Sequence, residues 1–418
     1  MKAHSVLPRR AAIVVFLTFA FAYFLSALLR AVTATLAPTL SQEFTLHASD
    51  LGLLAGGYFL GFAATQLPLG TWLDRHGPRQ VLLGFLGVAV AGCLVFSMAT
   101  GFSGLLAGRV LCGAGVSACL MAPLTGYRRW FEATAQMRAN SWMLMTGSLG
   151  MVASTLPVQW ALPLIGWRPL FWVLAALIAL SMLVIAVRVP VWDAAPKEAE
   201  GSAAPAVPQG YAMVWRHPYF QRLAPLGFCV YGGMVAMQTL WAGPWMQEVA
   251  GYTPLESAMG LFWINISMLC TFWTWGMVTP WLLRKGFGPD RLMVAGLPLC
   301  LVVLLGIILA GPEAGSGAWA LFCVSCTFVS LSQPAVAMAF PQALAGRALS
   351  AYNLVIFAGV FVVQWGIGLA VDAFTTAGLS PVESFQAAMA VYLACSTAAY
   401  AWFMLRGQRH NVLQTSAP

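Results

Sequence analysis

Apolar runs of membrane-spanning length repeat along most of this chain, and short polar segments separate them. A helix needs roughly 20 mostly apolar residues to cross a bilayer. Charge-poor runs long enough to do so lie at residues 11–37, 51–73, 80–99, 103–127, 139–163, 168–189, 223–247, 257–283, 291–311, 317–341, 350–372 and 384–405. We therefore predict an all-α membrane protein with twelve transmembrane helices.

The composition agrees with a membrane protein and leaves no room for a large soluble domain. Of the 418 residues, 60% are hydrophobic and 8% are charged, whereas a typical soluble domain has about 25% charged residues. Nearly all of the chain outside the predicted spans is short loop. A soluble enzyme is therefore excluded, and we predict that the chain is not an enzyme.

Basic residues gather in alternate loops, and this pattern predicts the orientation of the chain. If the N-terminus is cytoplasmic, 18 of the 21 Lys and Arg residues fall in the tails and loops on that side. The opposite loops carry acidic residues and a single basic one, Arg168. The positive-inside rule then places both termini in the cytoplasm, and we expect the membrane to be a bacterial-type inner membrane. The rule also explains the net charge of +8 without a nucleic-acid partner.

Two halves with weak internal similarity flank a polar linker. The stretch 190–222 begins rich in Ala, Pro and Gly and has too little apolar surface to fold alone. The end of this stretch mixes aromatic residues with Arg216, which predicts a short helix at the membrane interface. The competing interpretation is that these residues are a second start of the following transmembrane helix. We predict a six-helix bundle at 1–189 and another, with the C-terminal tail, at 223–418. Two pairs of segments are similar between the halves: Pro38-x3-Gln42-Glu43 resembles Pro244-x2-Gln247-Glu248, and Gly77-Pro78 resembles Gly288-Pro289.

A turn between the second and third spans carries the most specific signal in the sequence. It reads Gly70-Thr-Trp-Leu-Asp74-Arg75-His76-Gly77-Pro78-Arg79. This segment resembles the signature of the major facilitator superfamily. The resemblance implies two six-helix bundles, with Asp74, Arg75 and Arg79 joining their cytoplasmic ends in one conformation and releasing them in the other. An ordinary solvated turn is the alternative.

The fourth span contains a charged residue, Arg109, in the pattern Arg109-x3-Gly113-x-Gly115. The pattern is similar to one found in the same superfamily. An arginine inside a membrane usually faces a cavity or a partner, so Arg109 is a functional candidate. Alternatively, it is structural and bonds main-chain carbonyls.

The first span carries a polar stripe that suggests an anionic solute. Its members follow at helical spacings of three, four and three, so they share one helix face: Tyr23, Ser26, Arg30 and Thr33. A guanidinium can hold a carboxylate or phosphate by two parallel hydrogen bonds. Snorkelling of Arg30 to the interface is the alternative.

Arg30 stands eight residues before Pro38. The spacing resembles the organic-anion and organophosphate branches of the superfamily. The organophosphate branch carries a second arginine eight residues before the proline of the seventh span, where this chain has Ala236. Because this chain has only the first of the two arginines, its resemblance to these branches implies a singly charged carboxylate or a small inorganic anion as the solute.

More polar side chains occur inside the predicted spans, and we expect them to line the same cavity. They are Tyr58, Tyr231, Gln238, Asn265, Asn353 and Gln364. No His, Asp or Glu lies well inside a span, so no buried proton relay is visible. The pair Cys323-x-x-Cys326 has neither a second pair nor a nearby His, so we expect no metal and no cofactor.

The sequence thus predicts a secondary active transporter that moves a small organic anion, a carboxylate, by alternating access. We expect it to work as a monomer in the lipid bilayer, and co-transport of a proton or a sodium ion stays open. One alternative is a proton-coupled exporter of drugs or other amphiphiles. A second alternative is a transporter-like sensor that binds a ligand and signals through a partner.

Overall fold

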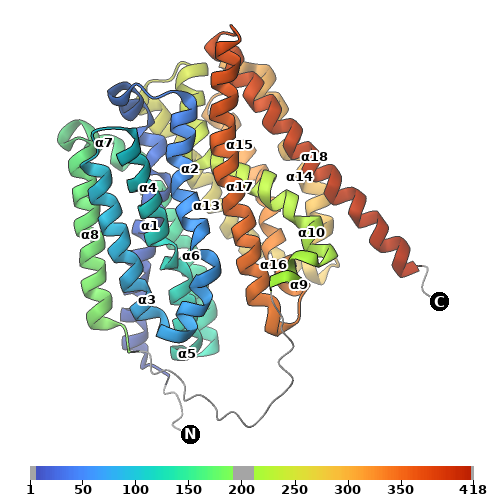
Figure 1. Cartoon of the computed structure of the whole chain (residues 1–418). Helices are drawn as coiled ribbons and strands as arrows, with labels where there is room; N and C mark the ends of the chain where they lie inside the picture. The colour runs from blue at the N-terminus through green and yellow to red at the C-terminus, as the bar shows by residue number, and fades with distance from the viewer. Residues whose placement is uncertain (1–5, 192–210, 416–418) are drawn as a thin grey trace. The chain divides into compact units, whose positions relative to one another are not determined.

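The computed structural model describes residues 6–191 and 211–415, and all regular secondary structure in these ranges is helical (Figure 1). The all-α prediction is therefore confirmed. The first half of the chain contains the helices α1 (Arg9–Phe44), α2 (Ala48–Ala64), α3 (Gln66–Ser97), α4 (Phe102–Val116), α5 (Ala118–Trp130), α6 (Ala133–Ala153), α7 (Leu156–Ile165) and α8 (Trp167–Arg188).

The second half opens with two short helices, α9 (Tyr211–Arg216) and α10 (Pro218–Pro225). From α10 the chain continues as one helical segment through π-helical and α-helical turns, η1 (Leu226–Tyr231), α11 (Gly232–Ala236), η2 (Met237–Trp241), α12 (Ala242–Pro244) and η3 (Trp245–Val249). The remaining elements are α13 (Pro254–Arg284), α14 (Pro289–Ala310), η4 (Gly311–Glu313), α15 (Ser316–Cys326), η5 (Thr327–Leu331), α16 (Ser332–Met338), α17 (Gln342–Thr376) and α18 (Pro381–Thr415).

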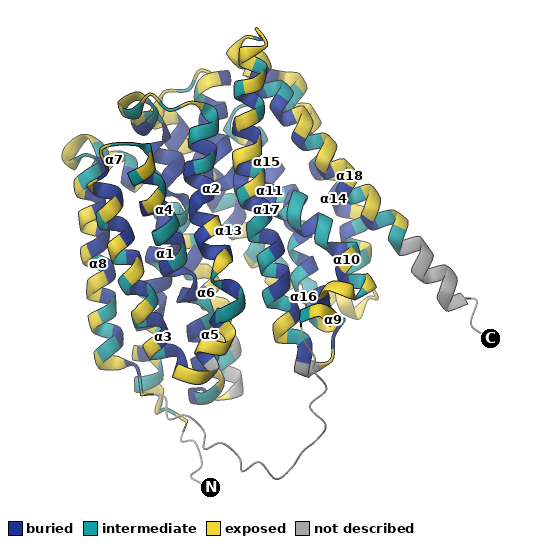
Figure 2. Cartoon of the chain, viewed as in Figure 1, coloured by how far each residue is buried: buried dark blue, intermediate teal, exposed yellow. Residues whose placement is uncertain are grey.

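Each of the twelve predicted spans corresponds to one helical segment of the described chain. Ten segments are long and apolar enough to cross a membrane, and the bent pair α6 and α7 makes an eleventh. The twelfth, α2, has only 17 residues before Thr65 interrupts it, and the helix then resumes in α3. The described chain exposes many large apolar side chains, as expected of surfaces that meet lipid. Figure 2 shows how buried and exposed residues are distributed along its helices.

Two interruptions of regular helix have local causes, one inside the fifth predicted span and one in the turn between the second and third spans. The fifth span bends by 43° between α6 and α7, where Thr155 leaves the helical conformation and Pro157 has no N–H to donate. The turn between the second and third spans lies inside α3 at Gly77, whose φ is 73°. A positive φ is readily adopted by glycine only, so the predicted tight turn is confirmed.

Internal contacts divide the chain into two compact units. The first unit comprises residues 1–32 and 57–208, and the second comprises 33–56 and 209–418. The adjoining ends of α1 and α2 thus pack with the second half of the sequence. The predicted bundles 1–189 and 223–418 remain a prediction. Most of the predicted linker, 192–210, lies outside the described residues, and the predicted short helix is present as α9.

In the first unit, α2 packs against α4 with no side chain between them at one point. A Cβ on Gly113 would stand 1.8 Å from the main-chain oxygen of Tyr58. Only glycine allows this approach, because any larger residue would overlap with the carbonyl. The glycine of the pattern Arg109-x3-Gly113 therefore fixes the position of Tyr58 relative to α4.

The second unit is built around buried tryptophans whose ring nitrogens bond to main-chain oxygens. Trp241 donates to the oxygen of Gln364 over 3.1 Å, and Trp245 donates to that of Ala314 over 3.0 Å. Trp245 also packs edge to face on Trp319 at 5.6 Å. These side chains are fully buried, so their indoles fix the segment η2–η3 against its neighbours.

Candidate functional site

Arg30 lies half-buried in the first unit, among polar and aromatic side chains. Its guanidinium makes polar contacts with the hydroxyls of Tyr23 on α1 and Tyr58 on α2. It also lies over the ring of Phe62 at 5.8 Å from the ring centre. The side chain is therefore directed at the neighbouring α2 within its own unit.

Tyr58 is the residue that holds this group together. It is fully buried, and its hydroxyl donates a hydrogen bond to the main-chain oxygen of Ser26 over 3.2 Å. Its ring packs on Phe59 at 5.2 Å and on Phe62 at 6.3 Å. A tyrosine restrained at both ends presents its hydroxyl to Arg30 in a fixed position.

The guanidinium of Arg30 retains hydrogen-bonding capacity for a further acceptor. Its Nε is buried and has no hydrogen-bond partner among the described residues. The groups that interact with it are two hydroxyls and a ring, and none of them is a carboxylate. A cation in such surroundings can bind an anion through paired, charge-assisted hydrogen bonds.

Arg109 occupies a different environment from Arg30. It is completely buried, it donates from Nη1 to the main-chain oxygen of Leu29 over 2.9 Å, and it lies over the ring of Tyr58 at 5.0 Å. Nε and Nη2 of Arg109 have no partner among the described residues, but the side chain joins α4 to α1 and has no exposed surface. This geometry favours the structural interpretation of Arg109.

The predicted polar stripe on α1 is divided between the two units. Tyr23, Ser26 and Arg30 belong to the first unit, and Thr33 belongs to the second. Ser26 and Thr33 are buried at 1% and 2% exposure. Of the four, Arg30 therefore has the most accessible side chain.

In the second unit, three polar side chains form a half-buried chain of hydrogen bonds. The hydroxyl of Tyr231 donates to Oε1 of Gln333 over 3.4 Å, and Nε2 of Gln333 donates to Oδ1 of Asn353 over 2.7 Å. Tyr231 and Asn353 are predicted site residues, and Gln333 was missed by the sequence analysis. The available signal was a glutamine inside the apolar run 317–341, directly before Pro334.

The other polar candidates of the second unit make hydrogen bonds inside the protein, although Oε1 of Gln364 has no partner among the described residues. Gln238 donates to Asn265 over 3.0 Å, and Asn265 donates to the main-chain oxygen of Leu261 over 2.9 Å. Gln364 is fully buried and donates to the hydroxyl of Thr239 over 2.9 Å. These bonds are internal, so the three predicted residues are better suited to holding helices together than to binding a solute.

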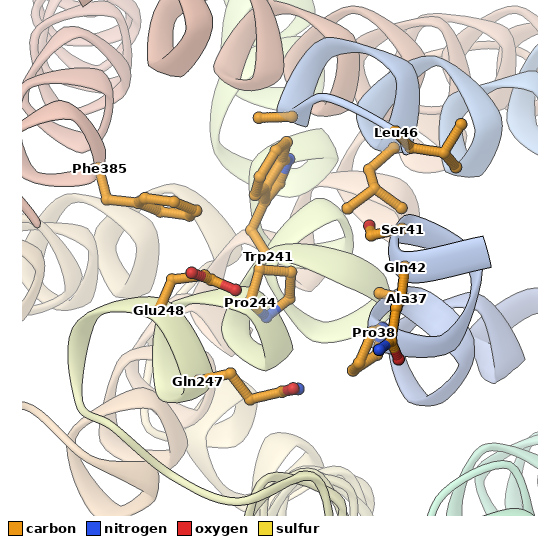
Figure 3. A pocket seen from close by; sticks show the side chains of 12 residues that line it. Ala37, Pro38, Ser41, Gln42, Leu46, Trp241, Pro244, Gln247, Glu248 and Phe385 are labelled. Carbon is orange, nitrogen blue, oxygen red and sulfur yellow. The ribbon is translucent and has the colours of Figure 1, made fainter. Parts of the chain in front are cut away.

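A cavity of about 550 Å³ lies in the second unit (Figure 3). Both copies of the repeated Pro–Gln sequence contribute to its walls, through Pro38 and Gln42 on α1 and through Pro244 and Gln247 on α12 and η3. The remaining lining residues are Ala37, Ser41, Leu46, Ala48, Leu51, Trp241, Glu248 and Phe385. The two segments that are paired by internal sequence similarity therefore line the same cavity.

The predicted gating turn is described in part. Arg79 donates to the main-chain oxygen of Ala186 in α8, and Arg75 is exposed. Gly77 supplies the turn, whereas Gly70 is exposed and a Cβ there would meet nothing within 4 Å. The side chain of Asp74 lies outside the described residues.

Metal binding is not indicated in the part of the chain that the structure describes. No group of three or more His, Cys, Asp or Glu side chains there could hold an ion. The two buried thiols nearest to Arg109, Cys93 and Cys112, have sulfur atoms 3.8 Å apart.

Comparison with known proteins gives both a family and a fold. The family model described as the Major Facilitator Superfamily matches residues 19–364. The probable L-galactonate transporter of Escherichia coli is 25% identical over 379 residues, which cover 83% of this chain and 73% of that protein. The hexuronate transporter of the same organism is 26% identical over 150 residues, which cover 36% and 35%.

Among solved structures, a bacterial homologue of the human lysosomal transporter Spinster, in an inward-facing and unoccupied conformation, superposes with a TM-score of 0.77. The two chains are 16% identical, and the match covers 96% of this chain and 98% of the other. At this identity the likeness shows a shared fold.

Proposed function

The chain belongs to the Major Facilitator Superfamily, and from this premise we propose that it is a secondary transporter that moves a small organic carboxylate across a bacterial inner membrane by alternating access. In this proposal it acts as a monomer with both termini in the cytoplasm. A co-transported proton or sodium ion would be its second partner. The fold and the multiple apolar helices support the transport part of the proposal.

One observation carries the choice of an anion. Arg30 is a half-buried cation whose described contacts are neutral, and its Nε has no partner among the described residues. A charge that is desolvated and not matched by a counter-ion is unfavourable. Binding of an anion would neutralise it, so occupancy would stabilise the site in a way that a neutral or cationic solute would not.

A carboxylate is favoured over a phosphate ester. Arg30 is one cation, and a singly charged carboxylate matches it in charge and in the geometry of two parallel hydrogen bonds. The names of two similar proteins, the probable L-galactonate transporter and the hexuronate transporter, refer to sugar acids, which are carboxylates. The half-buried chain of Tyr231, Gln333 and Asn353 offers neutral donors and acceptors that suit hydroxyl groups.

The proposal is tested by thermal stabilisation of the purified protein. The panel holds sugar acids, aromatic carboxylates, phosphate esters, inorganic anions and a cationic amphiphile, each added to the protein and to its Arg30→Gln variant. We expect carboxylates to raise the unfolding temperature of the parent and to lose about 10- to 100-fold in affinity with Arg30→Gln, as for the loss of a charge-assisted hydrogen bond.

The matched control is Arg188→Gln, which removes one positive charge at the exposed end of α8. This variant should bind carboxylates as the parent does. Stabilisation by the cationic amphiphile alone, with no effect of Arg30→Gln, would overturn the anion assignment and favour an exporter of amphiphiles. Uptake of the stabilising solute into vesicles that contain only this protein distinguishes a transporter from a sensor.

A further inference from the structure

A carboxylate at the end of α17 binds the first turn of α2. Oδ1 of Asp372 accepts a hydrogen bond from the main-chain N–H of Ala48 over 3.1 Å, and Oδ2 accepts one from Ser49 over 2.9 Å. Asp372 lies 324 positions after Ala48 and 323 positions after Ser49 in the sequence. The first N–H groups of a helix have no partner within it and carry partial positive charge, so a carboxylate is stabilised there.

The start of α2 already has a local acidic partner. Asp50, in the first turn of α2, accepts a hydrogen bond from the main-chain N–H of His47 over 3.1 Å. Formation of the helix end therefore does not depend on Asp372. The long-range carboxylate instead joins α2 to α17.

Close contact between the two main chains accompanies this bond. A Cβ on Gly52 would stand 2.3 Å from the main-chain oxygen of Gln364, and a Cβ on Gly368 would stand 2.3 Å from that of Ala48. The contacts pair higher residue numbers on α2 with lower ones on α17, so the two helices run antiparallel. No side chain separates the two helices at these points, so they are in direct main-chain contact.

The bond lies at the edge of the cavity shown in Figure 3. Ala48, which donates to Asp372, and Leu51, one turn further along α2, both line this cavity. Separation of α2 from α17 would remove part of its wall. Asp372 is the last residue of the predicted span 350–372, on the side that the charge pattern predicts to be external and opposite to the side predicted for Asp74.

We propose that Asp372 is an external latch, which holds the start of α2 against α17 while that side of the protein is closed and releases it when that side opens. The inference rests on the proposed function only in that a transporter must open its two sides in turn. Because the bond is made in one conformation only, it shifts the equilibrium between conformations. It does not require any contact with the solute.

The experiment measures how often the interface opens. Ala55 of α2 is 2% exposed, so a cysteine placed there reacts with a membrane-impermeant maleimide only when α2 is released. The background carries Cys270→Ser and Cys395→Ser, which remove the two exposed native thiols. Labelling of Ala55→Cys is then followed over time in the full chain, in vesicles and without solute.

We expect Asp372→Ala to raise the labelling rate about 5- to 30-fold, which corresponds to the loss of a helix-capping bond. Asp372→Asn should raise it less, because an asparagine oxygen can still accept one of the two bonds. The control is Glu383→Gln, an exposed acid on α18 whose described bonds go to Ser380 of its own turn. It should leave the rate unchanged.

An unchanged labelling rate in Asp372→Ala, with gel filtration and thermal unfolding like those of the parent, would overturn the latch. If the alanine variant does not fold, Asp372→Asn decides by the same comparison. The absence of solute separates this result from the anion proposal. If the latch proposal fails, the expected effect of Arg30→Gln on carboxylate binding is unchanged. If the anion proposal fails, the expected effect of Asp372→Ala on labelling is unchanged.

Discussion

Arg109 donates a hydrogen bond to the main-chain oxygen of Leu29, the residue directly before Arg30. The buried arginine therefore supports the segment of α1 that carries the half-buried one. Both guanidinium groups also lie against Tyr58, Arg30 through its hydroxyl and Arg109 over its ring. The contacts of Arg109 thus favour a supporting role for it, whereas we propose a binding role for Arg30.

We expect Arg109→Ala to destabilise the protein by about 2 to 4 kcal/mol, because it removes a buried hydrogen bond and leaves a cavity. Arg30→Ala should change the unfolding temperature far less, because Arg30 is half-buried. The measurement is thermal unfolding of both variants in the same detergent. An Arg109→Ala protein as stable as the parent but unable to bind carboxylates would show that Arg109 contacts the solute.

Tyr58→Phe should weaken carboxylate binding without loss of the fold. The substitution keeps the ring contacts with Phe59 and Phe62 and removes only the hydroxyl, which bonds to the oxygen of Ser26 and contacts Arg30. A neutral hydrogen bond contributes about 1 kcal/mol, so affinity should fall about 5-fold. Titration followed by tryptophan fluorescence measures it. Unchanged affinity would mean that Tyr58 does not orient Arg30.

The sequence predicted the membrane spans because apolar length alone determines which segments can cross a bilayer. It also identified Arg30, because a guanidinium inside an apolar run requires a polar neighbour. It could not rank Arg30 above Arg109, since that difference arises from Tyr58 and Leu29, which reach them from other parts of the chain.

Nor could the sequence tell an internal hydrogen bond from an accessible one. Gln364 was expected to line the cavity, and its partner Thr239 lies 125 residues away. Gln333 was missed because a single glutamine before a proline has no spacing pattern to mark it. Asp372 is one of several acids near the ends of the spans, and its bonds to Ala48 and Ser49 could not be predicted because they depend on how α2 and α17 pack.

Gly113→Ala should be strongly destabilising. Its Cβ would lie 1.8 Å from the main-chain oxygen of Tyr58, and a main-chain atom cannot rotate away as a side chain can. The helices α2 and α4 would have to separate, at a cost of about 1 to 3 kcal/mol or more. The matched control is Gly70→Ala, where a Cβ meets nothing within 4 Å and alanine is the better helix former. Equal unfolding temperatures for the two variants would contradict this assignment.

The two glutamines of the second unit should respond oppositely to substitution. Gln364→Leu removes a fully buried bond to Thr239 and should lower stability by about 1 to 3 kcal/mol. Gln333→Leu breaks the half-buried chain between Tyr231 and Asn353 and should reduce affinity for hydroxylated carboxylates while stability changes little. Comparing a sugar acid with a carboxylate that lacks hydroxyls separates these effects. If Gln333→Leu lowers the affinity for both solutes equally, Gln333 does not bind the hydroxyl groups of the solute.

Asp74→Asn should change the rate of solute exchange more than the affinity at equilibrium. The signature Gly70-x3-Asp74 predicts a carboxylate that joins the cytoplasmic ends of the bundles in one conformation only, so removing its charge alters the equilibrium between conformations while the solute site is kept. Counterflow of labelled solute in vesicles measures the rate, and thermal stabilisation measures the affinity.

The control for Asp74→Asn is Arg188→Gln, which changes one charge at the exposed end of α8. If Asp74 and Asp372 act on opposite sides, Asp74→Asn should also lower the labelling of Ala55→Cys, whereas Asp372→Ala raises it. The two substitutions together should then largely cancel, because each removes a bond that stabilises a different conformation. Exchange at the parental rate in Asp74→Asn would show that this turn is an ordinary solvated loop.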